Sequence, residues 1–195
     1  MGTISPTDRE RDAMDTPEIL RRSFPDWDVE TDHPAAYVSE TGDAVQALMY
    51  SYLIWPALIE RHGAVFLALD GNESEDFAER MGRPTPFVHP DWPALSWVDY
   101  VASFNFYEVP HLFRMLRGPA EVYDPSHEAL GVVLREAWAA RLAAAYPDRR
   151  FAVDLLENDG TMALRIVVRQ TFPELVAPEG YDPRRRGIIA GPSGA

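Results

Sequence analysis

The most constraining pattern in the sequence is a long amphipathic helix followed at once by a β-hairpin. From residue 126 to residue 146, apolar residues recur every three or four positions, which is typical of a helix that covers a sheet with one face. Apolar and polar residues then alternate over 151–155 and 162–168, on either side of the turn sequence Asn-Asp-Gly at 158–160. We therefore expect an α+β fold with an antiparallel sheet of about four or five strands and helices packed mainly on one face.

The residues before this pattern predict further elements from their caps, prolines and apolar runs. Asp15 and Glu18 have the spacing of a helix N-terminus. Pro56 must divide any helix that contains it, because proline has no backbone N–H to donate. The expected elements are a helix over 15–24, a strand over 35–39, a buried helix over 42–63 divided at Pro56, a buried strand over 64–69, a short helix over 74–81 and a helical segment over 96–118 interrupted at Pro110.

Chain length and composition favour one domain between two tails. A chain of 195 residues buries about 70% of the surface that it exposes when unfolded, which is enough for a core. Residues 1–14 are polar and residues 174–195 are rich in proline and glycine, so we expect both ends to be flexible. The sequence contains no signal-peptide pattern in its first residues and no apolar run of ~18 residues. It therefore predicts a single α+β domain over 15–173, in a cytoplasmic protein that does not contact a membrane.

The missing residue types exclude several kinds of chemistry. All 18 basic residues are arginine, and the chain has neither lysine nor cysteine, which excludes lysine Schiff bases, thiolate nucleophiles and thiolate-bound metals. The glycine-rich nucleotide motifs and the GxSxG elbow are missing, and the five histidines form no HxH, HxxxH or HExxH pair. We therefore expect no cofactor and no metal, and the sequence favours a non-catalytic protein. A GC-rich genome explains the missing lysine; a surface that escapes lysine-directed modification is the alternative.

The acidic residues are concentrated in the first half of the chain and indicate the charge of a partner. The net charge of −13 argues against nucleic-acid binding, which depends on basic residues, and residues 24–59 contain no lysine or arginine. A surface of one sign can attract a cationic protein, as in an immunity protein or an inhibitor; a solvated surface without a partner is the alternative. The candidate partner-binding residues are Asp26, Asp28, Glu30, Asp32, Glu40, Asp43, Asp70, Glu73, Glu75 and Asp76.

Two aromatic clusters, around residues 50–55 and 92–107, support an alternative hypothesis of a small-molecule pocket or an enzyme site between two helices. Glu108 and His111 have the Glu-x-x-His spacing of some di-metal helices, although Pro110 lies between them and no second copy of the motif occurs. His89 beside Asp91 could act as a general base in a proline-rich loop. The candidate pocket residues are Tyr52, Trp55, His89, Asp91, Trp92, Trp97, Glu108 and His111. An aromatic core that joins the two helices is the competing interpretation, and the sequence predicts no oligomeric state.

Overall fold

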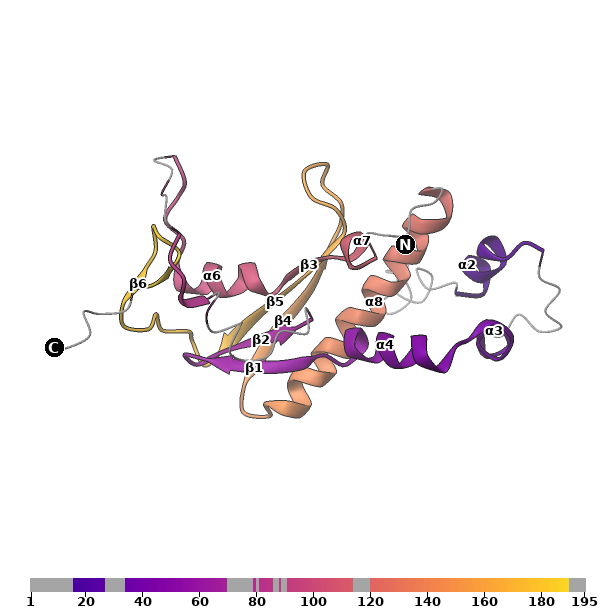
Figure 1. Cartoon of the computed structure of the whole chain (residues 1–195), viewed down its shortest axis with the longest axis horizontal. Helices are drawn as coiled ribbons and strands as arrows, with labels where there is room; N and C mark the ends of the chain where they lie inside the picture. Colours follow the sequence, from indigo (N-terminus) through magenta and orange to yellow (C-terminus); the bar gives the residue numbers. More distant parts are fainter. Residues whose placement is uncertain are drawn as a thin grey trace, which may run out of the picture. The chain divides into compact units, whose positions relative to one another are not determined.

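The protein forms helices together with antiparallel sheets, as seen in a computed structural model (Figure 1), so the predicted α+β class is confirmed. The structure describes residues 16–26, 34–69, 79, 81–85, 88, 91–113 and 120–189. The chain divides into two compact units, which are described separately: unit 1 contains 1–55, 107–138 and 154–166, and unit 2 contains 56–106, 139–153 and 167–195. The single domain expected over 15–173 stays a prediction.

The described strands form three small sheets instead of one larger one. Strands β3 (Phe106–Glu108), β4 (Arg150–Leu156) and β5 (Arg165–Phe172) form a sheet in the order β3-β5-β4, which contains the predicted hairpin. Two backbone hydrogen bonds, from Val109 N to Leu164 O and from Val168 N to Asn105 O, show that β3 and β5 run antiparallel. The other sheets are the pairs β1–β2 and β6–β7.

The N-terminal part of unit 1 consists of helices α2 (Thr16–Ser23), α3 (Pro34–Thr41) and α4 (Ala44–Ile54). Helix α2 confirms the helix expected near Asp15, whereas the strand expected over 35–39 is wrong, because this segment belongs to α3. Proline fits the first position of a helix, where its missing N–H has no partner in any case, so Pro34 favours the start of α3.

The buried helix expected over 42–63 is also wrong. Helix α4 ends at Ile54, before Pro56, and strand β1 (Ala57–Arg61) follows it. The φ angles of His62 and Gly63 are 49° and 76°, so both adopt the left-handed conformation that a two-residue hairpin turn needs. Gly63 therefore belongs to the turn that pairs β1 with β2 and does not end a helix.

Unit 2 is built around the hairpin of β1 and β2 (Ala64–Ala68), which confirms the strand expected over 64–69. Helix α6 (Trp97–Phe104) begins at Ser96, whose hydroxyl accepts a hydrogen bond from Asp99 N at 3.1 Å. The buried residues of this core are Ile59, Ala64, Phe66, Met81, Trp97, Tyr100 and Val101. Strand β2 and one face of α6 therefore supply most of the core of unit 2.

Residues 174–189, expected to belong to a flexible tail, contain the paired strands β6 (Tyr181–Asp182) and β7 (Gly187–Ile188) in unit 2. Tyr181 donates from its hydroxyl to Leu95 O at 2.8 Å, and Leu95 N donates to Pro183 O at 2.9 Å. These bonds attach the segment to the residues before α6. The proline and glycine content that suggested a tail therefore accompanies short strands and turns here.

The long amphipathic helix predicted after residue 126 is confirmed as α8 (Ala120–Ala145), which begins earlier than expected and includes Pro125. In unit 1, a Cβ atom on Gly131 would lie 2.9 Å from Leu155 Cδ1, so α8 and β4 approach too closely for a side chain there. The four-residue helix α7 (Val109–Leu112) follows β3. In Figure 1, the turn between β4 and β5 projects from the sheet.

Candidate functional site

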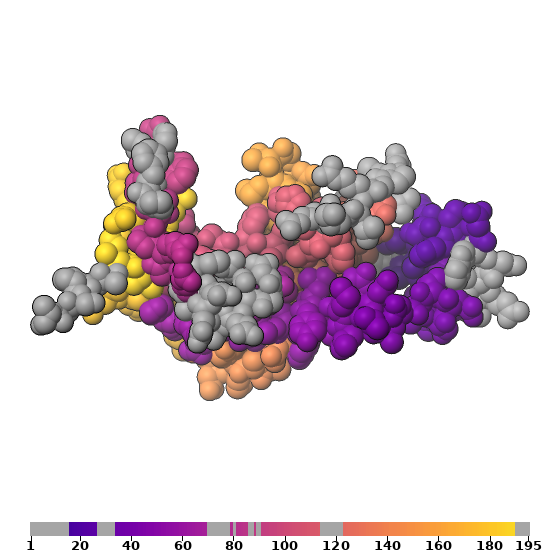
Figure 2. Space-filling view, in the orientation of Figure 1, coloured from indigo at the N-terminus to yellow at the C-terminus, as the bar shows by residue number. Residues whose placement is uncertain are grey.

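The sequence of helix α4, AVQALMYSYLI, contains no charged residue, and the helix exposes many of its apolar side chains. A helix that is apolar on all sides is normally buried, and large exposed apolar patches mark interaction sites. The exposed fractions reach 72% for Tyr52 and 65% for Leu48. The exposed large apolar residues of this segment are Val45, Leu48, Met49, Tyr50, Tyr52, Ile54 and Trp55. Figure 2 shows the residues of α3 and α4, in purple, as a continuous part of the surface of unit 1.

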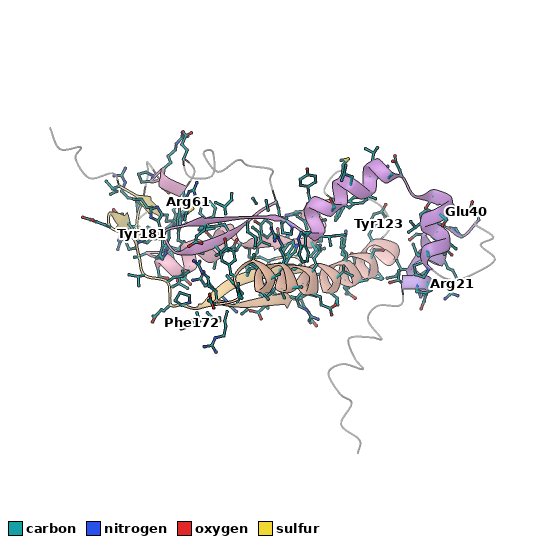
Figure 3. The ribbon with its side chains drawn as sticks, turned by 90° about the horizontal axis from the view of Figure 1, so that it is seen from below. Arg21, Glu40, Arg61, Tyr123, Phe172 and Tyr181 are labelled. Carbon is teal, nitrogen blue, oxygen red and sulfur yellow. The ribbon has the colours of Figure 1, made fainter. Side chains whose placement is uncertain are left out.

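Acidic side chains flank this helix at its N-terminal end. Glu40 lies in the last turn of α3, and Asp43 caps α4 by accepting a hydrogen bond from Val45 N at 2.7 Å. Both are exposed, and residues 34–55 contain no lysine or arginine. In Figure 3, Glu40 is labelled on α3, and several side chains of the neighbouring α4 project into open space. We call the exposed side chains of α4 and of its C-cap residue Trp55, together with Glu40 and Asp43, the α4 surface.

The structure describes only some of the predicted partner-binding residues. Asp26, Glu40 and Asp43 belong to unit 1 and are exposed. Helix α2 of the same unit carries Arg21 and Arg22, and Arg22 forms an ion pair with Glu18. The candidates that lie outside the described residues are Asp28, Glu30, Asp32, Asp70, Glu73, Glu75 and Asp76.

The aromatic residues predicted to line a pocket belong to both units and differ in their surroundings. Trp97 is 4% exposed in the core of unit 2, where its ring lies 5.1 Å from that of Tyr181 between centroids. Trp92 is half-exposed in unit 2, with the Arg186 guanidinium 4.9 Å from the centre of its ring. Tyr52 and Trp55 are part of the α4 surface, Asp91 is exposed, and His89 lies outside the described residues. Trp97 is therefore a core residue.

Glu108 and His111 do lie on one face, as the Glu-x-x-His spacing requires. His111 Nδ1 is 2.6 Å from Glu108 Oε2, because Pro110 lies in the first turn of α7, where proline is compatible with a helix. Glu108 Oε1 also accepts a hydrogen bond from Ala163 N at 2.9 Å, which ties the β4–β5 turn to this helix. Among the described residues, no group of three or more histidine, aspartate or glutamate side chains could hold a metal ion.

Unit 1 contains a cavity of about 470 Å³ that is absent from the sequence-based predictions. It is lined by Pro110, Asp124, His127, Glu128, Val132, Arg135, Leu155, Glu157, Asn158, Ala163 and Leu164. The available signal was the spacing of Asp124, His127 and Glu128, which places them on one helix face. The apolar pattern predicts a helix that begins only at residue 126, whereas α8 begins at Ala120 and includes Asp124.

His127 is half-buried at this cavity, and its environment favours the neutral imidazole. Burial lowers the pKa of His127 below its ordinary value, and the nearby carboxylate of Asp124 opposes that shift. The side chain of Tyr123 lies one turn earlier on α8, with its ring centroid 6.1 Å from that of His127. At neutral pH, His127 therefore contributes an uncharged polar group to the cavity wall.

Arg165 and Asp159 brace the turn that forms one wall of the cavity. Arg165 is 8% exposed; its Nη1 donates to Glu157 O at 3.0 Å and its Nη2 donates to Asp159 Oδ2 at 2.7 Å. Asp159 Oδ1 accepts hydrogen bonds from the backbone N–H groups of Thr161 and Met162. These backbone bonds, together with Arg165, lower the pKa of Asp159 to about 2.

The pKa of Asp159 predicts an acid-dependent loss of stability. In the folded state this carboxyl stays ionised down to about pH 2, whereas in the unfolded chain it is protonated near pH 4. The ionised carboxyl therefore contributes fully to the free energy of unfolding above about pH 4, and this contribution is lost as the pH falls toward 2. Asp159→Asn should therefore reduce the difference in free energy of unfolding between pH 5 and pH 2.5, measured by urea unfolding. Asp148→Asn, at an exposed position, is the matched control, and an unchanged pH dependence in Asp159→Asn would contradict the assignment.

Comparisons of this chain with protein-family models, with curated proteins and with solved structures found no match. Among the residues that the structure describes, no helix is both long enough and apolar enough to cross a membrane. The described residues of unit 1 contain two candidate sites, the α4 surface and the cavity beside α8.

Proposed function

We propose that this protein is a non-catalytic binding protein, of the immunity-protein or inhibitor kind, that uses the α4 surface to bind a cationic protein partner. The observation that carries the proposal is an uncharged helix whose large apolar side chains are exposed and whose N-terminal end is flanked by Glu40 and Asp43. Burying this helix against a partner removes apolar area from water, which is the main source of affinity in protein association.

The charge of the chain determines which kind of partner fits this surface. A second copy would bring two chains of net charge −13 together, which like-charge repulsion opposes. A partner with an apolar patch bordered by arginine or lysine would complement both the α4 side chains and the acidic residues beside them. An amphipathic basic helix has this arrangement and is a common way for one protein to dock on another.

The two kinds of residue should contribute to binding in different ways. Tyrosine and tryptophan are over-represented among the residues that dominate interface energies, so Tyr52 and Trp55 are the expected anchors. Glu40 and Asp43 lie at the edge of the apolar side chains, where charges mainly accelerate encounter and make binding sensitive to salt. Apolar substitutions should therefore raise the dissociation rate, and charge substitutions should lower the association rate.

A synthetic amphipathic helix of leucine and lysine tests this proposal, with a leucine–glutamate peptide of the same pattern as its control. The protein should bind the lysine peptide and not the glutamate peptide, as measured by fluorescence anisotropy of the labelled peptide. The double variant Leu48→Ser with Tyr52→Ser should weaken binding by about 30-fold or more, since truncating a hot-spot residue costs about 2 kcal/mol. Glu40→Gln with Asp43→Asn, which keeps a capping side chain, should slow association by about tenfold at low salt.

Matched control variants separate this surface from general effects of charge and apolarity. Val176 is 78% exposed in unit 2, so Val176→Ser removes an exposed apolar side chain elsewhere. Glu174→Gln with Glu179→Gln removes two exposed charges from the same unit. Both control variants should bind the lysine peptide as the original protein does. Equal binding of the two peptides, or unchanged binding by the Leu48 and Tyr52 variant, would refute the proposal.

Native mass spectrometry of the protein isolated from its own host at low salt then tests the proposal on a natural partner. We expect a second polypeptide of basic isoelectric point that dissociates as the salt concentration rises. The same polypeptide should be lost from the Leu48→Ser, Tyr52→Ser variant and retained by Val176→Ser. A partner that the α4 variant keeps would show that binding uses another surface.

A further inference from the structure

The cavity beside α8 has an apolar wall of the kind that holds the carbon skeleton of a small molecule. Its volume of about 470 Å³ falls within the range of roughly 300–1,000 Å³ that is typical of small-molecule sites. Val132 is buried on α8, and Leu155 and Leu164 come from the two sides of the hairpin. Because Gly131 has no side chain, α8 lies close enough to Leu155 for these residues to form one continuous wall.

The charged residues that line this cavity are mostly acidic. Asp124 and Glu128 are one helical turn apart on α8, which separates their Cβ atoms by about 5–6 Å. Glu157 lies across the cavity on the β4–β5 turn, and Arg135 is two turns further along α8 from Glu128. Arg135 has a carboxylate partner, with Nη2 3.6 Å from Glu136 Oε1. Burial lowers the pKa of His127 and so favours its neutral form. His127 therefore adds no positive charge that would compensate the carboxylates of the cavity.

From this geometry we infer that the cavity of unit 1 binds a small organic cation, an alkyl or aralkyl amine, with its ammonium group between Asp124 and Glu128 and its carbon chain against Val132, Leu155 and Leu164. The ammonium group makes charge-assisted hydrogen bonds with the carboxylates, which are stronger than bonds between neutral groups. This site is separate from the α4 surface, so the inference does not depend on the proposed function.

The wall opposite α8 is fixed before a ligand arrives. Arg165 and Asp159 hold the β4–β5 turn from within, and Glu108 holds Ala163 through its backbone N–H. A site whose walls are already ordered loses little conformational entropy when it binds a ligand. The cavity therefore has the shape, charge and rigidity that selective binding of a small amine requires.

Binding of n-hexylammonium to the full chain tests this inference, with n-hexanol and hexanoate as neutral and anionic probes of similar shape. Titrations followed by NMR should shift the imidazole signals of His127, which belongs to the cavity wall. We expect the ammonium probe to bind about tenfold more tightly than hexanol, and hexanoate to bind more weakly than both, because like charges repel. Equal affinity for all three probes, or binding that leaves His127 unshifted, would overturn the inference.

Two variants distinguish the contribution of the carboxylate charges to binding from that of the cavity volume. Asp124→Asn with Glu128→Gln should weaken binding of hexylammonium by about tenfold while leaving hexanol unaffected, since only the charged bonds are removed. Val132→Phe should reduce binding of both probes by filling the cavity, and Asp148→Asn in unit 2 is the control that should change neither. Circular dichroism checks that each variant is folded; if Val132→Phe does not fold, the double carboxylate variant alone decides. Undiminished hexylammonium binding by that variant would overturn the inference.

Discussion

Replacing Trp138 with alanine should lower the free energy of unfolding by about 3–5 kcal/mol, the usual cost of removing a large aromatic side chain from a core. Trp138 is completely buried on α8, and its ring lies 5.5 Å from that of Tyr107 between centroids, in an edge-to-face arrangement. Its indole Nε1 donates to Leu53 O at 2.8 Å, in the last turn of α4. Urea unfolding followed by circular dichroism measures the loss.

A second substitution at this position isolates the hydrogen bond from the packing. Trp138→Phe keeps an aromatic ring but leaves Leu53 O without its donor, which should cost about 1–3 kcal/mol. Because Leu53 belongs to α4, the same variant should also weaken binding of the lysine peptide, whereas Trp92→Ala at a half-exposed position of unit 2 should not. If Trp138→Ala destabilises the protein no more than Trp92→Ala does, the packing role given to Trp138 is wrong.

The sequence predicted best those elements whose signal is local. The amphipathic period of α8 and the alternation of β4 and β5 each repeat over many residues, so the helix and the hairpin were both recognised. The composition of the apolar segment before Pro56 wrongly predicts a buried helix, because apolar residues are usually buried. The same composition in α4 is exposed in the structure, and exposure of this kind depends on packing between distant segments, which periodicity does not report.

The turn at residues 62 and 63 shows how one local error affects a whole segment. A glycine after an apolar helix usually marks its C-terminus, so the sequence predicts a helix that ends at Gly63. In the structure, Gly63 is the second residue of a hairpin turn. The hairpin pairs Ile59 with Phe66, and both of these side chains are buried in the core of unit 2. The strand 57–61 was missed because nothing in its five residues alone distinguishes it from the end of a helix.

The candidate sites were predictable only in part. The acidic character of the first half of the chain follows from composition, and Glu40 and Asp43 are exposed as a partner-binding role requires. The cavity of unit 1 could not be predicted, since it combines residues of α7, α8 and the β4–β5 turn that are distant in the sequence. The alternative hypothesis places Trp92 and Trp97 in a pocket, with an aromatic core as the competing interpretation, and in the structure Trp97 packs against Tyr100 and Tyr181 in the core of unit 2.

Replacing Asn105 with leucine should destabilise the protein by about 2–6 kcal/mol, because leucine has a similar volume but no polar atoms. Asn105 is 1% exposed, and its side-chain amide forms two hydrogen bonds with the backbone of β2: Oδ1 accepts from Leu67 N at 3.0 Å, and Nδ2 donates to Val65 O at 2.9 Å. Leucine would remove both of these hydrogen bonds from buried backbone groups, at about 1–3 kcal/mol each. Asn158→Ala, which removes one exposed bond to Gly160 N, should cost about 1 kcal/mol or less.

Asn105→Asp tests whether the hydrogen bond that Asn105 Nδ2 donates to Val65 O stabilises β2. A carboxylate keeps the acceptor for Leu67 N but faces Val65 O with a second acceptor, so its charged form should be strongly destabilising in this buried position. Burial raises the pKa of such a carboxyl above that of the unfolded chain, so stability should increase as the pH falls through the folded-state pKa, where the protonated group donates to Val65 O. Urea unfolding at pH 7 and pH 5 measures this recovery. Asn105→Leu, which has no titratable group, should show none; equal pH dependence in the two variants would mean that the amide does not pair with the backbone of β2.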